Sequence, residues 1–400
     1  MKQFFARQKS VLFPIITAMI LIGILIAVPT GYEDALIYQG TERAIGKVTK
    51  TDNAAIKTSG LVQSGEQSCM LEIEDGIFKG QTLEGVNFLT GSLEKDKIFK
   101  VGDRALLTIS YDGDNVKSVV MSDHYRLDKE ILLLGIFAVF LVIFAGKNGF
   151  QAILSFVITV LMIWKVLVPC YLKGYSPVWT GIVIVTVITA IIIFFVYGAD
   201  KRTLAATLGS LLGIATTCVL GICFTDLFHI HGAIMSNAES LLYSGYQDLD
   251  LTSIFMSSIF IGASGAMMDL AVDITSAIWE VIQKKPDIDW KEATRSGIHV
   301  GQAAMGTMTT TLLLAYSGGY IALLMVFMAQ GTPIDHILNY KYVSAEVLET
   351  VVGSFGLVTV APFTAVTAGV LLTGKKHRQS TLAEHEEKML TKFLHNDNKR

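Results

Sequence analysis

Residues 177–198 read PVWTGIVIVTVITAIIIFFVYG and contain no charged side chain. A helix of about 20 apolar residues crosses the hydrocarbon of a bilayer, and it satisfies its own backbone hydrogen bonds there. The stretch therefore predicts a transmembrane helix. The composition of the whole chain agrees, because only 17% of its 400 residues are charged, whereas a soluble domain carries about 25%.

Seven other apolar stretches predict further spans, so we expect a polytopic α-helical membrane protein with about eight transmembrane helices. They lie at about residues 11–28, 130–146, 149–171, 203–226, 252–282, 298–330 and 346–373. The first resembles a signal peptide, but no small-x-small cleavage site follows it, so we expect an uncleaved anchor. The two longest contain Gly262–Gly265 and Gly318–Gly319, which favour a break, a kink or a steep tilt.

Residues 30–128, between the first and second spans, have a different pattern. Strand-like runs such as 44–49 and 105–111 alternate with turns at 74–76 and 111–114. Short strands with Gly- and Asp-rich turns are typical of a small β-rich barrel or sandwich. The chain is thus expected to have four parts. These are residues 1–29 (N-terminal start and first helix), 30–128 (β-rich domain), 129–374 (seven-helix core) and 375–400 (charged tail of helical pattern).

The distribution of basic residues predicts the orientation. Lysines and arginines gather in the N-terminal start, near residues 147 and 201–202, in the loop 284–295 and in the tail, which eight spans place on one side. The loop 226–251, on the other side, has none. By the positive-inside rule, both termini are cytoplasmic and the β-rich domain is extracytoplasmic.

Several classes of function are disfavoured. The formal net charge of −3 argues against a nucleic-acid partner. The four cysteines form no CxxC pair and no zinc-type spacing with histidine. There is no GxSxG elbow, HExxH motif or phosphate-binding loop. We therefore expect no catalytic residues, no metal site and no enzymatic activity.

The predicted span at 252–282 carries acids where lipid makes them costly. Asp269 and Asp273 are one helical turn apart, and Gly262 and Gly265 precede them on much the same side. Two such carboxylates cannot both stay ionised without help, so a proton, a small cation or a basic side chain is needed. Alternatively, they hydrogen-bond to neighbouring helices and only fix the fold. No other cofactor is expected.

The next span supplies polar groups without charge. Gln302, Gly306, Thr307, Thr310 and Tyr316 fall on its polar part, so they are candidates for lining a pathway. For any single threonine, a hydrogen bond to its own helix is the alternative.

The last predicted span adds one acid and two residues that affect helix packing. Glu349 is either an entry ligand for a solute or ion or an ordinary acid at the water boundary. Gly353 and Pro362 follow it as candidates for close packing or a helix break.

Three of these stretches together resemble the YibE/F family of bacterial membrane proteins. They are GASGAMMDLAVDITSA at 262–277, residues 301–318 with GTMTTTLLLAYSG from Gly306, and ETVVGSFG at 349–356, followed by Pro362. The resemblance covers nearly the whole chain. It implies a multi-pass permease of the bacterial plasma membrane and supplies no binding or catalytic residues.

Three functions of different classes remain open from the sequence. The acid pair beside a threonine-rich span favours a permease or secondary transporter for an unknown small solute or ion. A sensor or accessory subunit, docking a partner through the outer domain, is the alternative. An intramembrane hydrolase is disfavoured, because both aspartates lie on one helix. The Gly209 and Gly213 pair permits helix contacts within one bundle or in a homo- or hetero-oligomer.

Overall fold

The structure is a computed structural model that describes residues 2–32 and 40–373. The chain forms two compact units, one of Gly31–Gly146 and the other of Met1–Thr30 with Lys147–Arg400. The charged tail predicted to be helical lies outside the described residues.

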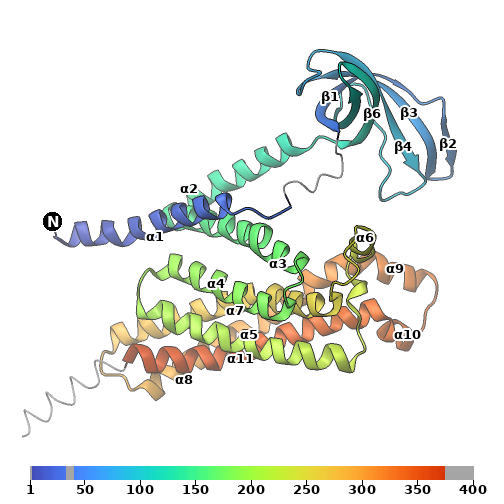
Figure 1. Cartoon of the computed structure of the whole chain (residues 1–400). Coiled ribbons are helices and arrows are strands. Elements are labelled where there is room, and N and C mark those ends of the chain that lie inside the picture. Colours follow the sequence, from blue (N-terminus) through green and yellow to red (C-terminus); the bar gives the residue numbers. More distant parts are fainter. Residues whose placement is uncertain (1, 33–39, 374–400) are drawn as a thin grey trace, which may run out of the picture. The chain divides into compact units, whose positions relative to one another are not determined.

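The first unit contains a closed β-barrel (Figure 1). Its strands are β1 (Thr41–Asp52), β2 (Ile56–Ser59), β3 (Val62–Ile73), β4 (Thr82–Thr90), β5 (Arg104–Asp112) and β6 (Asn115–His124). The strand order is β1-β5-β6-β4-β3-β2, and an additional β1–β3 pairing closes five strands into a barrel that β2 extends. Neighbours are antiparallel except β4 and β6, which are parallel. This is a five-stranded Greek-key barrel, the architecture of OB-folds.

The barrel core follows from a two-residue alternation. Ala105, Leu107 and Ile109 of β5 are fully buried because every second side chain of a strand points inward. Gly85 faces the same interior, where a Cβ atom would overlap the Leu71 side chain. A small residue opposite a large one is how a narrow barrel is filled.

Cys69 is another member of this core. It is 1% exposed and has no disulfide partner. Burial raises the pKa of its thiol to about 11, because the thiolate would lose its hydration.

Two amides are buried inside the barrel and bind a loop to it. The Gln67 side chain donates from Nε2 to the Phe99 carbonyl (2.9 Å) and accepts from the Phe99 N–H (3.0 Å). It also accepts a hydrogen bond from Nδ2 of Asn87 (3.2 Å), and Asn87 donates to the Lys97 carbonyl (2.6 Å). Because such networks leave unpaired groups when broken, they are worth more than exposed hydrogen bonds.

We predict that Gln67→Ala destabilises the barrel by about 2–4 kcal/mol, since it removes several buried hydrogen bonds and leaves the Phe99 N–H unpaired. Hydrogen-exchange mass spectrometry should show lost protection around Phe99. Gln81→Ala, at an exposed position, is the control. Equal protection in the two variants would contradict this role.

Asp96 organises the same loop. Its carboxylate accepts from the backbone N–H groups of Thr90 (2.9 Å), Gly91 (2.7 Å) and Ser92 (2.9 Å). These bonds, the Thr90 N–H first, hold the pKa of Asp96 below its ordinary value of 3.8. A carboxyl with a depressed folded-state pKa stabilises the fold above its unfolded pKa, and this contribution is lost as pH falls through the folded value.

We therefore predict that Asp96→Asn lowers the thermal stability of the barrel at neutral pH. The gap between variant and wild type should shrink as the pH falls below 3.8, because the carboxyl of the unfolded chain is protonated first and that of the folded protein at lower pH. Thermal unfolding of both proteins across pH measures this, and a pH-independent gap would refute it.

The helices are α1 (Lys2–Ala27), α2 (Leu127–Met162), α3 (Val168–Leu172), α4 (Pro177–Tyr197), α5 (Lys201–Leu227), α6 (Ala238–Tyr243), α7 (Leu251–Lys284), α8 (Trp290–Ser317), α9 (Ile321–Ala329), α10 (Ile334–Asn339) and α11 (Lys341–Thr373). Short turns join some of them, including a π-helical turn at Ile163–Leu167 and 3₁₀ turns at Gly232–Ile234 and Gly318–Tyr320.

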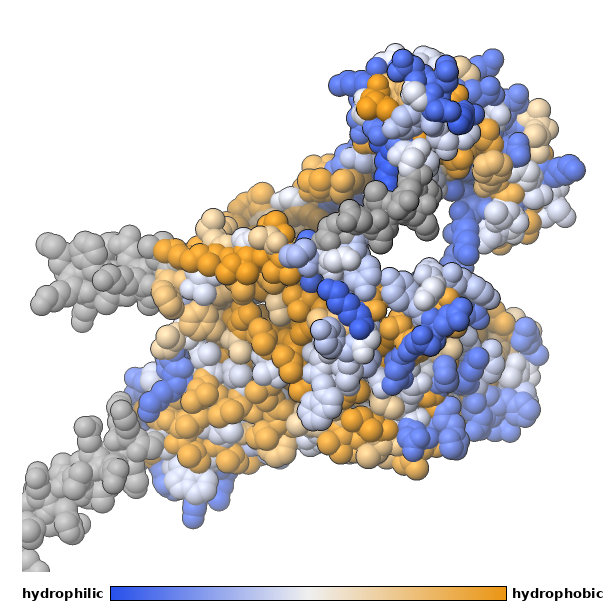
Figure 2. All heavy atoms as spheres, viewed as in Figure 1, coloured by the Kyte–Doolittle hydropathy of each residue, from blue (hydrophilic) through white to orange (hydrophobic). Residues whose placement is uncertain are grey.

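Among the described residues, six helical stretches are long and apolar enough to cross a membrane. These are Leu127–Leu172, Pro177–Tyr197, Lys201–Leu227, Leu251–Lys284, Trp290–Ala329 and Lys341–Thr373. A shorter apolar stretch, Phe13–Ala27, belongs to α1. Figure 2 shows hydrophobic residues, in orange, over much of the visible surface of the helices. The length and the apolar composition of these helices therefore indicate that the chain is a membrane protein.

The expected spans can be compared with the structure at three places. The spans expected at 130–146 and 149–171 are two helical segments of the stretch Leu127–Leu172 that meet at Gly146, whose backbone is not helical (φ 54°, ψ −123°). This conformation is open to glycine because it lacks a Cβ atom. The span expected at 298–330 is divided by the 3₁₀ turn at Gly318. By contrast, α7 continues as a helix through Gly262–Gly265.

The second unit has its core between α5, α7, α8 and α11. Gly209 and Gly213 of α5 lie against Thr364 and Val360 of α11, so closely that a Cβ atom on either glycine would overlap them. Small residues let helix backbones approach in this way. The glycine pair is thus used within the bundle.

Candidate functional site

The strongest concentration of polar groups inside the second unit lies where α7 and α11 begin and α8 ends. Glu349 of α11 is partly buried, and its Oε1 lies 3.3 Å from the Ser258 hydroxyl of α7. The same hydroxyl lies 2.7 Å from the Phe255 carbonyl of its own helix. A hydroxyl has one proton to donate, so it cannot satisfy both acceptors at once.

Tyr316 completes this arrangement from α8. A Cβ atom at Gly262 of α7 would overlap the Tyr316 hydroxyl oxygen, so the absence of a side chain there makes room for the phenol. The carboxyl groups of Glu346 and Glu349 both lie within electrostatic range of Tyr316. We call Ser258, Tyr316, Glu346 and Glu349 the acid–tyrosine cluster.

Glu346 is the member that sequence reasoning missed. Its Oε1 atom is inaccessible to solvent and has no hydrogen-bond partner among the described residues. It precedes Glu349 by three residues, so both lie on one face of α11. That spacing in an apolar helix is the signal that would have identified it. Neither glutamate forms an ion pair with any described residue.

Asp269 and Asp273 lie further along α7, on the same exposed side as Gly262 and Gly265. Neither aspartate forms an ion pair within the described part of the chain. Glu280, two turns beyond Asp273, is already paired with Lys284 at 2.8 Å.

Arg202, at the start of α5, is a basic residue that is already paired with an acid. Arg202 pairs with Asp200 (Nη2 to Oδ2, 2.8 Å) and stacks on Tyr197, whose ring centroid is 4.9 Å from the guanidinium carbon. The Tyr197 hydroxyl donates to the Val272 carbonyl, at 2.6 Å. This cluster fixes the α4–α5 turn on α7.

Apart from Tyr316, the polar residues predicted on α8 are not brought to the acids by any contact among the described residues. Thr307 and Thr310 donate to the carbonyls of Ala304 (3.0 Å) and Gly306 (3.2 Å) of their own helix. Gln302 is exposed. The structure therefore joins Tyr316 to Glu349 and Gly262, and leaves the other candidates of α8 apart.

The predicted packing residues are used unequally. Gly353 of α11 faces the Ala263 side chain of α7, which a Cβ atom would crowd. No atom lies near the corresponding position at Gly265 or Gly306. Pro362 lies within α11, which continues to Thr373. No group of three His, Cys, Asp or Glu residues that could hold a metal ion occurs among the described residues.

These features define a polytopic helical membrane protein with a separate barrel and with carboxylates set into its helices. The chain belongs to the YibE/F-like family, whose model matches residues 133–374. The match covers most of the helices and begins after the barrel. Comparisons with curated proteins and with solved structures gave no match.

The contact between Gly262 and Tyr316 can be tested with matched glycines. We predict that Gly262→Ala lowers the thermal stability by displacing Tyr316, and that Tyr316→Phe in the same background restores part of it by removing the clashing oxygen. Gly265→Ala, which meets open space, should be neutral or stabilising by about 1 kcal/mol. Equal losses at the two glycines would contradict the packing.

Proposed function

We propose that this protein is a membrane permease, a secondary transporter that couples movement of a small solute or ion to a proton or small cation. The observation that supports it is the acid–tyrosine cluster, because its two carboxyl groups lie close together in the helical unit without a basic partner among the described residues.

The physical argument begins with the cost of charge in lipid. An intramembrane carboxylate is expensive unless it is paired, protonated or bound to a cation. Glu346 and Glu349 repel each other when both are ionised, so binding one proton or cation relieves the repulsion. Carboxylate and hydroxyl oxygens are also suitable ligands for hard cations. The cluster thus has the chemistry of a reversible site.

A route for the bound ion follows the open side of α7. Ser258 begins this side, and Asp269 lies 11 residues later, about 16 Å along the helix axis. Asp273 follows one turn further. Acids separated in this way would serve as successive sites for a proton or cation, with Gly265 between them leaving the side of α7 open. The interruption of α8 directly after Tyr316 is consistent with such a site, because transporters commonly place ligands at broken helices.

The distribution of lysine and arginine supports an orientation for this route. We propose that both termini face the cytoplasm of a bacterium, that the protein lies in the plasma membrane and that the barrel is extracytoplasmic. The acid–tyrosine cluster would then face the outer side and the aspartates would lie further in.

A transport role accounts for these residues better than hydrolysis does. Asp269 and Asp273 lie on consecutive turns of one helix, whereas aspartic chemistry needs two carboxyl groups that share a proton and a water. We therefore propose that the protein is not an enzyme.

The test is ion and proton flux into liposomes containing the purified full-length protein, with a panel of cations. We predict that Glu349→Gln and Asp269→Asn each lower a cation-specific or proton flux by about tenfold or more, since each removes a charged ligand. Glu280→Gln is the control, because this acid is on the same helix and already ion-paired.

Unchanged flux in well-folded Glu349→Gln and Asp269→Asn proteins would overturn the proposal. A protein without residues 35–125 adds a second comparison. If that deletion abolished activity while the neutralised acids had no effect, a sensor or accessory role for the barrel would replace the permease.

A further inference from the structure

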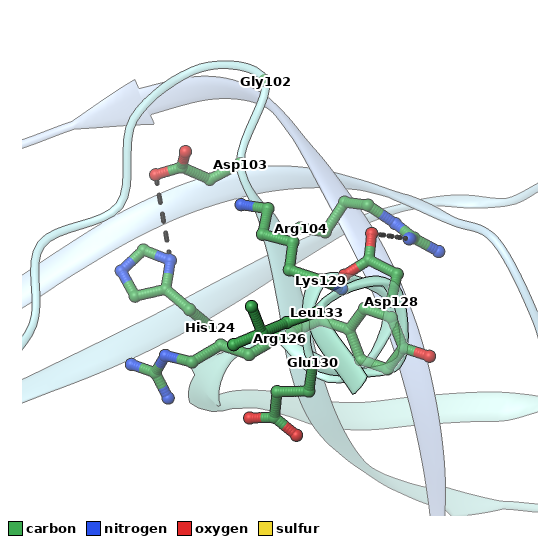
Figure 3. Close-up of a pocket in the computed structure, with 10 residues that line it drawn as sticks. Gly102, Asp103, Arg104, His124, Arg126, Asp128, Lys129, Glu130 and Leu133 are labelled. Carbon is green, nitrogen blue, oxygen red and sulfur yellow. Dashed lines mark hydrogen bonds and ion pairs between the residues drawn. The ribbon is translucent and has the colours of Figure 1, made fainter. Parts of the chain in front are cut away.

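The first unit contains a hollow of about 620 Å³ where β5 begins, β6 ends and α2 starts. Figure 3 shows its lining as sticks, with side chains from the barrel rim on one side and from the first turns of α2 on the other. The residues that matter below are Asp103, His124, Arg126, Lys129, Glu130 and Leu133.

Some charges of this hollow are already engaged with one another. Arg104 pairs with Glu74 (2.6 Å) and with Asp128 (3.1 Å), and its guanidinium lies over the ring of Tyr125. These contacts join the barrel to the start of α2, and they engage the Arg104 guanidinium with two carboxylates. Arg104, Tyr125 and Asp128 therefore form a wall of the hollow whose charges are already paired.

The remaining charges are less engaged. Arg126 is about half exposed and pairs only with Asp123, at 2.9 Å. Lys129 and Glu130 form no ion pair with any residue in the described ranges 2–32 and 40–373. Asp103 accepts a hydrogen bond from the Lys100 N–H (2.7 Å) and lies 3.9 Å from His124. One cation and one acid, Lys129 and Glu130, are thus unpaired among the described residues, with the partly exposed Arg126 beside them, which favours a zwitterion over a simple anion.

The hollow continues into an apolar helix face. Leu133, Phe137, Phe140 and Phe144 follow Lys129 and Glu130 at helical spacing, and they are 69%, 59%, 58% and 81% exposed. Phe140 and Phe144 stack with ring centroids 6.1 Å apart. A polar hollow above an apolar strip matches a molecule with a charged head and a hydrocarbon tail.

We propose that this hollow binds a phospholipid whose headgroup carries a phosphate and a primary ammonium group. Lys129 and Arg126 take the phosphate, because charged donors bind phosphate oxygens strongly. Glu130 takes the ammonium. One acyl chain lies along Leu133 and the phenylalanines of α2. His124, stacked on Phe99 with ring centroids 4.3 Å apart, forms the wall on the barrel side.

This chemistry distinguishes the ligand from related molecules. A phosphatidylglycerol headgroup has no ammonium for Glu130, and a choline headgroup has an ammonium that cannot donate hydrogen bonds. The soluble headgroup alone, glycerophosphoethanolamine, lacks the chain that the apolar strip would hold. Phosphatidylethanolamine has all three features.

The experiment is native mass spectrometry of the full-length protein in detergent, titrated separately with phosphatidylethanolamine, phosphatidylglycerol, phosphatidylcholine and glycerophosphoethanolamine. We expect one phosphatidylethanolamine to bind more tightly than the other three. The double substitution Arg126→Gln with Lys129→Gln should weaken it about tenfold or more. Lys117→Gln is the control, because this lysine pairs with Asp112 at 3.0 Å on the barrel surface, outside the lining of the hollow.

Leu133→Gln provides a second variant that leaves the charges in place. It should weaken phosphatidylethanolamine and leave the thermal stability of the ligand-free protein unchanged, since the side chain is exposed. The proposal is overturned if the double variant binds as tightly as Lys117→Gln, if phosphatidylglycerol binds as tightly as phosphatidylethanolamine, or if the headgroup alone binds equally well.

Discussion

The close contact of α11 with its neighbours sets the geometry of the helical unit. A Cβ atom at Gly356 would overlap Thr217 of α5 and Met267 of α7, and one at Gly353 would crowd Ala263. Without side chains at these positions, the backbone of α11 comes near enough to α7 for Glu349 to reach Ser258. In lipid, such van der Waals packing replaces the hydrophobic effect as a cause of helix association. The acid–tyrosine cluster thus depends on glycines that carry no chemistry themselves.

Both units contain a buried polar oxygen without a partner among the described residues, Oδ1 of Asn87 in the barrel and Oε1 of Glu346 in the bundle, but the two groups differ in chemistry. In the barrel, the buried Gln67 and Asn87 amides bind each other and the neighbouring loop, so they stabilise a fixed structure. In the bundle, Glu346 has an inaccessible oxygen without a partner in the described structure. A buried polar group without a hydrogen-bond partner in the protein is a candidate for binding a ligand or an ion. A carboxyl group can bind a proton or a cation, whereas an amide stays neutral, so the carboxyl groups of α11 support a binding role better than the amides of the barrel do.

The sequence alone predicted a helical membrane protein with a β-rich domain, and it named Tyr316 and Glu349 of the candidate site. Long apolar runs predict helices because lipid imposes one solution on the backbone, and alternation in β5 predicts a strand. The closure of the barrel by β1 and β3 depends on a long-range pairing that no local pattern contains. Glu346 was missed because an acid at a helix start is usually solvated. For the threonines of α8 the sequence left two roles open, lining a pathway or bonding to their own helix, and Thr307 and Thr310 do bond to their own helix.

Cys69 has a consequence for handling the protein. Its thiol lies in the barrel core with a pKa of about 11, so at neutral pH almost none of it is the reactive thiolate. All four cysteines are unpaired, and the barrel core is assembled without a cross-link. The domain is thus expected to fold equally well in reducing and oxidising compartments. Maleimide reagents would leave Cys69 untouched and label the exposed Cys223 and the partly exposed Cys170, so a spectroscopic probe on native sulfur would report on the helical unit.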